Sequence, residues 1–189
     1  MLRIAPRPLG EYPWYVRLLL RAQRRKYGLV LTPALLWALG RLALAACGPW
    51  LVSADMRLAV DWLRAQPFSN GKVAAVGYCG GGRFAFLAAA RCGVDGAAAL
   101  YGLGISEHLA EIGNVRCPVQ MHYGLKDQHI PRQEIDAVAT GVQGRPSMEV
   151  FLYPEAGHSF ANPVRPTYDA AATKLAGERI GRMLEAMRL

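Results

Sequence analysis

The sequence predicts an α/β fold, in which a mostly parallel sheet carries helices on both faces. From residue 55 onward, apolar segments of about 4–8 residues alternate with helical patterns, as strand–helix–strand units require. Hydrophobic residues make up 52% of the 189 residues and charged residues only 19%, so the chain can bury a core. No internal repeat or low-complexity segment interrupts the pattern, which favours a single domain over residues 1–189.

The elements follow in chain order from these patterns. The clearest helix is 55–66, since Met56, Val60 and Leu63 fall on one face and Pro67 follows as a stop. Apolar runs predict strands at 27–32, 72–77, 96–101, 118–123 and 148–153. Helical composition predicts helices at 14–26, 34–46, 81–91, 132–140 and 167–188, with a helical turn at 107–111.

A cysteine between glycines stands directly after the strand predicted at 72–77. Gly77, Cys79 and Gly81 form the nucleophile-elbow pattern G-x-[nucleophile]-x-G, with sulfur in place of the usual serine oxygen. We expect strained backbone angles at Cys79, and glycines at 77 and 81 because a Cβ at either position would clash. The turn also places Cys79 at a helix N-terminus, where the helix dipole favours a thiolate.

Two further loops follow strands at the same predicted edge of the sheet. Asp127 follows the strand 118–123, and His158 follows the strand 148–153, which gives the chain order nucleophile, acid, histidine of a hydrolytic triad. The histidine would accept the thiol proton, and the aspartate would orient the imidazole. The alternative role of Asp127 is that of a turn-forming carboxylate, and the alternative for His158 is a loop histidine without a catalytic role. His122 lies inside its strand and His129 lies two residues after Asp127, so we prefer His158 to both.

The net charge of +8 is concentrated at the start of the chain. Eight basic residues against Glu11 alone give +7 within residues 1–50, and no nucleic-acid-binding module accompanies them, which excludes that function class. The four cysteines show no metal-ligand spacing and no secretory signal opens the chain. We therefore expect free thiols, no metal, no cofactor and a cytoplasmic location.

The apolar segment 29–52 has two interpretations. Its length and the preceding basic cluster Arg24-Arg25-Lys26 fit a membrane anchor. Arg41 and two prolines within it argue against a membrane span, since a central arginine costs about 2.5–3.5 kcal/mol. A buried strand followed by a helix is the preferred interpretation.

Four segments together resemble the dienelactone hydrolase (carboxymethylenebutenolidase) family. They are Asp61–Pro67, Gly77–Gly82, His122–Asp127 with Ile130-Pro131, and Tyr153–Phe160. The resemblance implies an α/β-hydrolase fold and a Cys79–His158–Asp127 triad, with the Gly80 backbone N–H as one oxyanion donor. It also implies hydrolysis of a dienelactone to maleylacetate by way of an acyl-enzyme.

The chain departs from the family pattern at several positions. Residues 55–189 match well, whereas 1–54 are divergent or incomplete and lack the first strands, a second oxyanion donor and a glutamate that contacts the resting cysteine. Ala34 stands where the family has an aspartate, and Glu11 is out of register. Asn162 replaces the arginine that binds the substrate carboxylate, with Arg165 as a nearby substitute. Without the first strands, one edge of the sheet would be open, and open edges favour association. We therefore expect a monomer or a weak homo-oligomer.

The preferred interpretation is a hydrolase of a small ester or lactone, without a nucleic-acid or membrane partner. The missing oxyanion donor predicts low activity even with an intact triad. The alternative is a degenerate, weakly active or inactive family member that keeps the fold as a binding or associating protein. A third interpretation is a hydrolase anchored in a membrane by residues 29–52.

Overall fold

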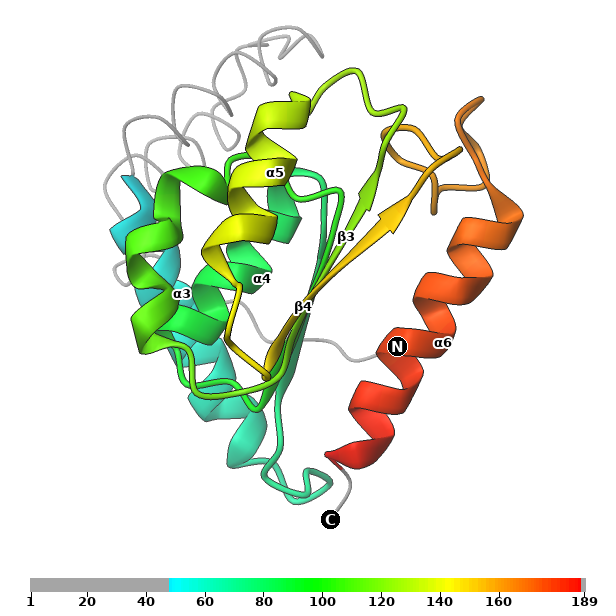
Figure 1. Cartoon of the computed structure of the whole chain (residues 1–189). Coiled ribbons are helices and arrows are strands. Elements are labelled where there is room, and N and C mark those ends of the chain that lie inside the picture. Colours follow the sequence, from blue (N-terminus) through cyan, green and yellow to red (C-terminus); the bar gives the residue numbers. More distant parts are fainter. Residues whose placement is uncertain (1–47, 188–189) are drawn as a thin grey trace, which may run out of the picture. The chain divides into compact units, whose positions relative to one another are not determined.

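The computed structural model describes residues 48–187 of the chain, and those from Pro49 onward belong to one compact unit (Figure 1). Four strands form its sheet, and they lie side by side in their order along the chain. They are β1 (Ala74–Tyr78), β2 (Gly96–Leu100), β3 (Val119–Gly124) and β4 (Met148–Tyr153). All three pairings are parallel, as the sequence predicts.

The register of the sheet brings the carboxyl ends of the strands to one edge. Tyr78 pairs with Leu100, Leu100 with His122, and His122 with Phe151. The loops that follow β1, β3 and β4 therefore leave the sheet at the same edge, although they are far apart in sequence.

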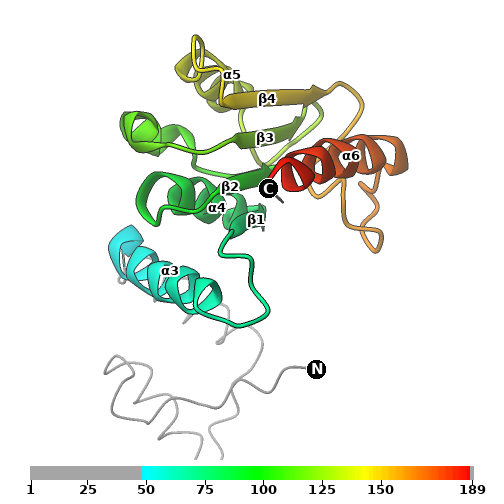
Figure 2. The ribbon, with the colours of Figure 1, turned by 90° about the horizontal axis from the view of Figure 1, so that it is seen from below.

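Helices cover both faces of the sheet (Figure 2). The connecting helices α4 (Gly80–Arg91), η2 (Ser106–Asn114) and α5 (Arg132–Gly141) lie on one face, and α6 (Ala170–Ala186) lies on the other. This follows from the strand order, because right-handed crossovers that all advance in one direction place their helices on one face. α3 (Gly48–Arg64) lies beside α4, and Arg91 donates a 3.0 Å hydrogen bond to the Ser53 hydroxyl.

The core lies between the central strands and the first helix layer. Phe86 and Leu87 of α4, with Met121 and Tyr123 of β3, are among its fully buried side chains. β2 and β3 are buried along their whole length. β1 is instead one of the two edge strands of the described sheet, and its residues Val76 and Tyr78 are 43% and 53% exposed.

Some predicted element bounds are wrong. α3 begins at Gly48 rather than residue 55, and the predicted helical turn is the longer 3-10 helix η2. The last helix begins at Ala170 rather than residue 167 because the Asp169 carboxylate caps it, accepting a 2.9 Å hydrogen bond from the Ala172 N–H.

Several predictions concern residues that the structure does not describe. The strand at 27–32, the helices at 14–26 and 34–46, and the divergent first part (1–54) of the single predicted domain lie wholly or largely outside residues 48–187. Within residues 48–187, no helix has the length and hydropathy needed to cross a membrane. The anchor interpretation of 29–52 also falls largely on residues outside this range and stays a prediction.

Candidate active site

Cys79 occupies a sharp turn between β1 and α4. Its φ of 54° and ψ of −124° lie outside the ordinary regions for a side-chain-bearing residue, which agrees with the strained turn expected from the sequence. The turn is fixed on both sides, since the Cys79 N–H donates to the Leu100 carbonyl at 3.0 Å and the Gly82 N–H donates to the Cys79 carbonyl at 2.9 Å. Cys79 therefore stands at the N-terminus of α4, beside N–H groups without an intrahelical acceptor.

The glycines of the turn have unequal roles. A Cβ on Gly77 would lie 1.9 Å from the Gly81 carbonyl oxygen, so glycine is required there, as the sequence predicts. The same prediction for Gly81 is wrong, because apart from its chain neighbours and the adjoining backbone of α4, no atom of the described residues lies within 4 Å of a Cβ built on it. The second close approach is at Gly82, whose Cβ would lie 2.6 Å from the Gly102 Cα.

Asp127 lies in the loop after β3 with its carboxylate directed inward. Its Oδ1 accepts hydrogen bonds from the N–H groups of His129 at 2.7 Å and Ile130 at 3.1 Å, and its side chain is only 1% exposed. Burial opposes ionisation of this carboxyl group. The hydrogen bonds from His158 and from the backbone outweigh burial, so the pKa of Asp127 lies below its usual value.

His158 lies between the other two side chains. Its Nδ1 is 2.8 Å from Asp127 Oδ2, and its Nε2 is 3.2 Å from Cys79 Sγ. The loops meet closely, since a Cβ on Gly124 would lie 2.3 Å from the Ala156 carbonyl oxygen. The structure thus brings together the three side chains that the sequence singled out. Cys79 and His158, the first and last of them, are 79 residues apart in the chain.

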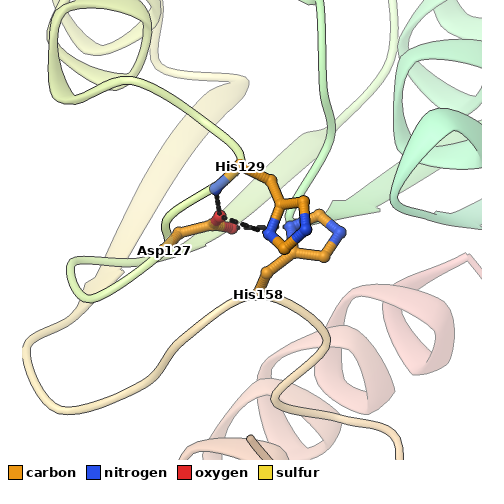
Figure 3. A group of neighbouring side chains, drawn as sticks. All are labelled: Asp127, His129 and His158. Atoms are coloured by element: carbon orange, nitrogen blue, oxygen red, sulfur yellow. Dashed lines mark hydrogen bonds and ion pairs between the residues drawn. The ribbon is translucent and has the colours of Figure 1, made fainter.

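The two other histidines of this region are placed differently. His122 is fully buried within β3, where its Nδ1 is 2.8 Å from the Tyr153 hydroxyl and its ring stacks on Phe151. Burial, followed by the nearby Arg179 guanidinium, lowers the pKa of His122 to about 4. His129 has an exposed ring that packs against His158 with centroids 4.5 Å apart (Figure 3). Neither histidine hydrogen-bonds to Cys79, whose thiol faces His158 instead.

Residues 44–188 match the model of the dienelactone hydrolase family. The chain belongs to this family. A carboxymethylenebutenolidase of Pseudomonas putida is 42% identical over 125 residues, which are 66% of this chain and 53% of that protein. Carboxymethylenebutenolidase 1 of Cupriavidus pinatubonensis is 34% identical over 134 residues, 71% of this chain and 57% of that protein. The chain therefore spans about half the length of the curated relatives that it matches.

Solved structures show the same fold. A dienelactone hydrolase-like promiscuous phosphotriesterase from metagenomic libraries superposes with a TM-score of 0.65 at 24% identity, covering 72% of this chain and 62% of that one. An esterase of Pyrococcus furiosus gives a TM-score of 0.56 at 14% identity, covering 71% and 61%. This dienelactone hydrolase family member thus has an α/β-hydrolase fold.

Sequence reasoning missed Tyr101 in this family member. Tyr101 directly follows β2, has a φ of 40°, and places its buried ring 5.2 Å from the His158 ring and 5.3 Å from that of Phe160. Burial raises the pKa of Tyr101 to about 12, so its hydroxyl is neutral at physiological pH. The strand-end rule that singled out the other loops applies equally to the end of β2 and could have identified it.

The positions expected to bind the substrate lie in the long loop between β4 and α6. Asn162 uses its Oδ1 to accept a 3.2 Å hydrogen bond from the Val164 N–H, and the Arg165 side chain is exposed.

A cavity of about 1020 Å³ lies elsewhere, lined by Arg116, Gln120, Arg182 and other residues of the amino ends of the strands and of α6. None of the three candidate catalytic residues lines this cavity.

The arrangement suits nucleophilic chemistry at a carbonyl group. A thiol, an imidazole and a carboxylate in series can transfer one proton and stabilise the resulting imidazolium. Gly80 is the first residue of α4 and directly follows Cys79. Asp127, His129 and His158 also form a group with metal-ligating atoms, the only one found among residues 48–187, in which all ligand atoms lie within 4.8 Å of one another.

Proposed function

We propose that this chain is a hydrolase of small esters or lactones that acts through Cys79, His158 and Asp127. The observation that carries the proposal is the continuous series of contacts from sulfur to carboxylate, 3.2 Å from Cys79 Sγ to His158 Nε2 and 2.8 Å from His158 Nδ1 to Asp127 Oδ2. Both distances are short enough for proton transfer or orientation by hydrogen bonding.

The proposed reaction has two halves. Cys79 Sγ attacks the carbonyl carbon while its proton passes to His158 Nε2. The bond to the leaving oxygen then breaks, and His158 returns the proton to that oxygen, which leaves a thioester on Cys79. Water next gives a proton to His158 and a hydroxyl to the acyl carbon, and the acid departs as Cys79 regains its proton.

Asp127 and Gly80 have supporting roles in this proposal. The buried Asp127 carboxylate keeps the proton of the neutral imidazole on Nδ1, which leaves Nε2 free to accept the thiol proton. The Gly80 N–H would stabilise the oxyanion, a contribution of about 2.7–4 kcal/mol per donor. Because the sequence predicts no second oxyanion donor in residues 1–54, we expect turnover to be slow.

The substrate class follows from the relatives and from one substitution. The curated relatives are named carboxymethylenebutenolidases, after a lactone that carries a carboxylate. Asn162 has no positive charge to pair with such a carboxylate, so we propose a substrate range that includes neutral esters. We propose further that residues 1–189 form a single dienelactone-hydrolase-like domain, in which 1–54 are divergent or incomplete, and that the enzyme acts in solution.

Selective alkylation tests the proposed nucleophile. Iodoacetamide labelling followed by peptide mass spectrometry would give a rate for each cysteine of the chain. Because burial alone slows Cys92 and Cys117, the decisive comparison is between wild type and His158→Ala, in which Cys79 stays accessible but loses its base. We expect the variant to slow labelling of Cys79 by at least about 10-fold near neutral pH. Equal labelling rates at Cys79 in the two proteins would contradict the proposal.

Ester hydrolysis provides the second test. With p-nitrophenyl acetate, a neutral ester, we expect turnover that His158→Ala abolishes. Turnover that survives this substitution would place the chemistry elsewhere in the chain.

A further inference from the structure

A second imidazole lies against the proposed triad but outside its proton path. The side chain of His129 is 70% exposed, and its ring lies over that of His158 at an interplanar angle of 37° (Figure 3). His129 Nδ1 is 3.9 Å from Asp127 Oδ1, and His158 Nδ1 is 2.8 Å from Asp127 Oδ2. Two imidazole nitrogens therefore face one carboxylate.

We propose that Asp127, His129 and His158 form an inhibitory site for a divalent transition-metal ion, for which Zn²⁺ is the best-suited candidate. Imidazole nitrogen and carboxylate oxygen are common ligands of Zn²⁺, and zinc sites with three protein ligands keep a fourth position open for water. The inference goes beyond the proposed function, because it concerns an ion that the hydrolytic reaction does not use.

Metal binding at this group requires the side chains to move. Ligand atoms about 2.0–2.1 Å from a tetrahedral Zn²⁺ lie about 3.3 Å from one another. The 2.8 Å between His158 Nδ1 and Asp127 Oδ2 is shorter than this value, and the ligand atoms of all three residues lie within 4.8 Å of one another. Rotation of the exposed His129 side chain would bring its nitrogen closer, and its position at the surface gives an ion direct access.

The surroundings of the carboxylate are already ordered. The N–H groups of His129 and Ile130 both hold Asp127 Oδ1, so they would fix the carboxylate ligand from behind. Such outer hydrogen bonds are a regular part of metal sites because they orient the ligands. The ion would replace one proton, the one shared between Asp127 and His158.

Binding at this site would stop the proposed reaction for a definite reason. A metal ion on His158 Nδ1 leaves the proton of the neutral imidazole on Nε2. Nε2 is the atom 3.2 Å from Cys79 Sγ, and in that form it cannot accept the thiol proton. Inhibition would therefore be reversed by a chelator, without any covalent change to the cysteine.

Calorimetric titration of the full 189-residue chain with Zn²⁺ tests the site. His129→Phe keeps an aromatic ring against His158 but removes the ligand nitrogen, and we expect it to raise the Kd for Zn²⁺ by at least about 10-fold. Cys79→Ser is the matched control and should leave the Kd unchanged. Co²⁺ used in place of Zn²⁺ should give no thiolate-to-metal charge-transfer absorption.

Two results would overturn the proposed metal site. An unchanged Kd in His129→Phe overturns the proposal. A Kd that rises in Cys79→Ser, with thiolate absorption for Co²⁺, also overturns it, because the ion would then lie between Cys79 and His158. Binding is measured without substrate, so failure of the proposed hydrolysis is a separate result: absent turnover with His129-dependent binding would reject the enzyme but keep the metal site.

Discussion

The two ends of the parallel sheet can be compared directly. At the carboxyl end, Cys79, Tyr101 and Ser159 have positive φ, and they are the only non-glycine residues with this conformation in the described part of the chain. At the amino end the backbone is ordinary, and the Asp95 carboxylate joins α3 to the starts of β1 and β2. It accepts hydrogen bonds from Arg64 at 2.7 Å, the Val73 N–H at 3.0 Å and Lys72 at 3.1 Å.

This comparison of the two ends indicates that the carboxyl end holds the residues for catalysis and the amino end holds residues that stabilise the fold. Strained backbone conformations cost about 1–3 kcal/mol each and persist only where the surrounding structure enforces them. The ion pairs and hydrogen bonds of the amino end join separate elements of the fold. Substitutions at the carboxyl end should therefore change activity with little effect on stability, and substitutions at the amino end should do the reverse.

The largest expected effect is that of Cys79→Ala. Removal of the proposed nucleophile should lower kcat for p-nitrophenyl acetate by about 10⁶-fold, as for other triads, while the free energy of unfolding changes by less than about 1 kcal/mol. Cys117→Ala, in the buried segment before β3, is the matched control. It should keep activity and lose about 1 kcal/mol of stability. Similar activities for the two variants would remove the distinction between the ends.

Asp127→Asn should have the next largest effect. An amide cannot hold the imidazole in the required tautomer, so kcat should fall by about 10⁴-fold while the fold is kept. Asp95→Asn provides the comparison at the amino end and should leave kcat unchanged. A loss in Asp127→Asn no greater than that in Asp95→Asn would contradict the assigned role.

The buried His122 lies within β3 and should affect only the pH dependence of stability. Its pKa is about 4 in the folded chain against an ordinary value of 6.5. Between these values the unfolded chain binds the proton and the folded chain does not, so stability falls as pH falls through this window, by up to about 3 kcal/mol. His122→Phe should reduce the fall between pH 7 and pH 4 in urea unfolding. An equal fall in both proteins would contradict the neutral, buried state.

Asp95→Asn should have the smallest effect, confined to stability. Burial raises the pKa of Asp95, but the bonds to Arg64, Val73 and Lys72 outweigh burial and lower it to about 2. Because the folded pKa is depressed, the stabilisation is present above the ordinary pKa of 3.8 and is lost as pH falls toward 2. At pH 7 we expect the substitution to cost about 2 kcal/mol in urea unfolding. Equal stability at pH 7 would show that the network contributes nothing.

The fold and the site differed in how far the sequence could predict them. The strands from β1 to β4 and the three convergent loops were predictable, because apolar alternation and strand-end polar residues are local signals. Gly77 was predictable from the elbow pattern, whereas the close approach at Gly82 depends on Gly102, which lies in another loop. Tyr101 and His129 approach His158 only through the packing of separate loops. The start of α6 depended on which of several turn residues capped it.

The central claim is that Cys79 carries the acyl group during turnover. Mass spectrometry of the chain, quenched in acid during hydrolysis of p-nitrophenyl acetate, tests this claim most directly. We predict one added acetyl group, located by peptide mapping on Cys79 and absent from Cys79→Ala and His158→Ala. Turnover without any acetyl group on Cys79, or an acetyl group that persists on another residue in Cys79→Ala, would contradict it.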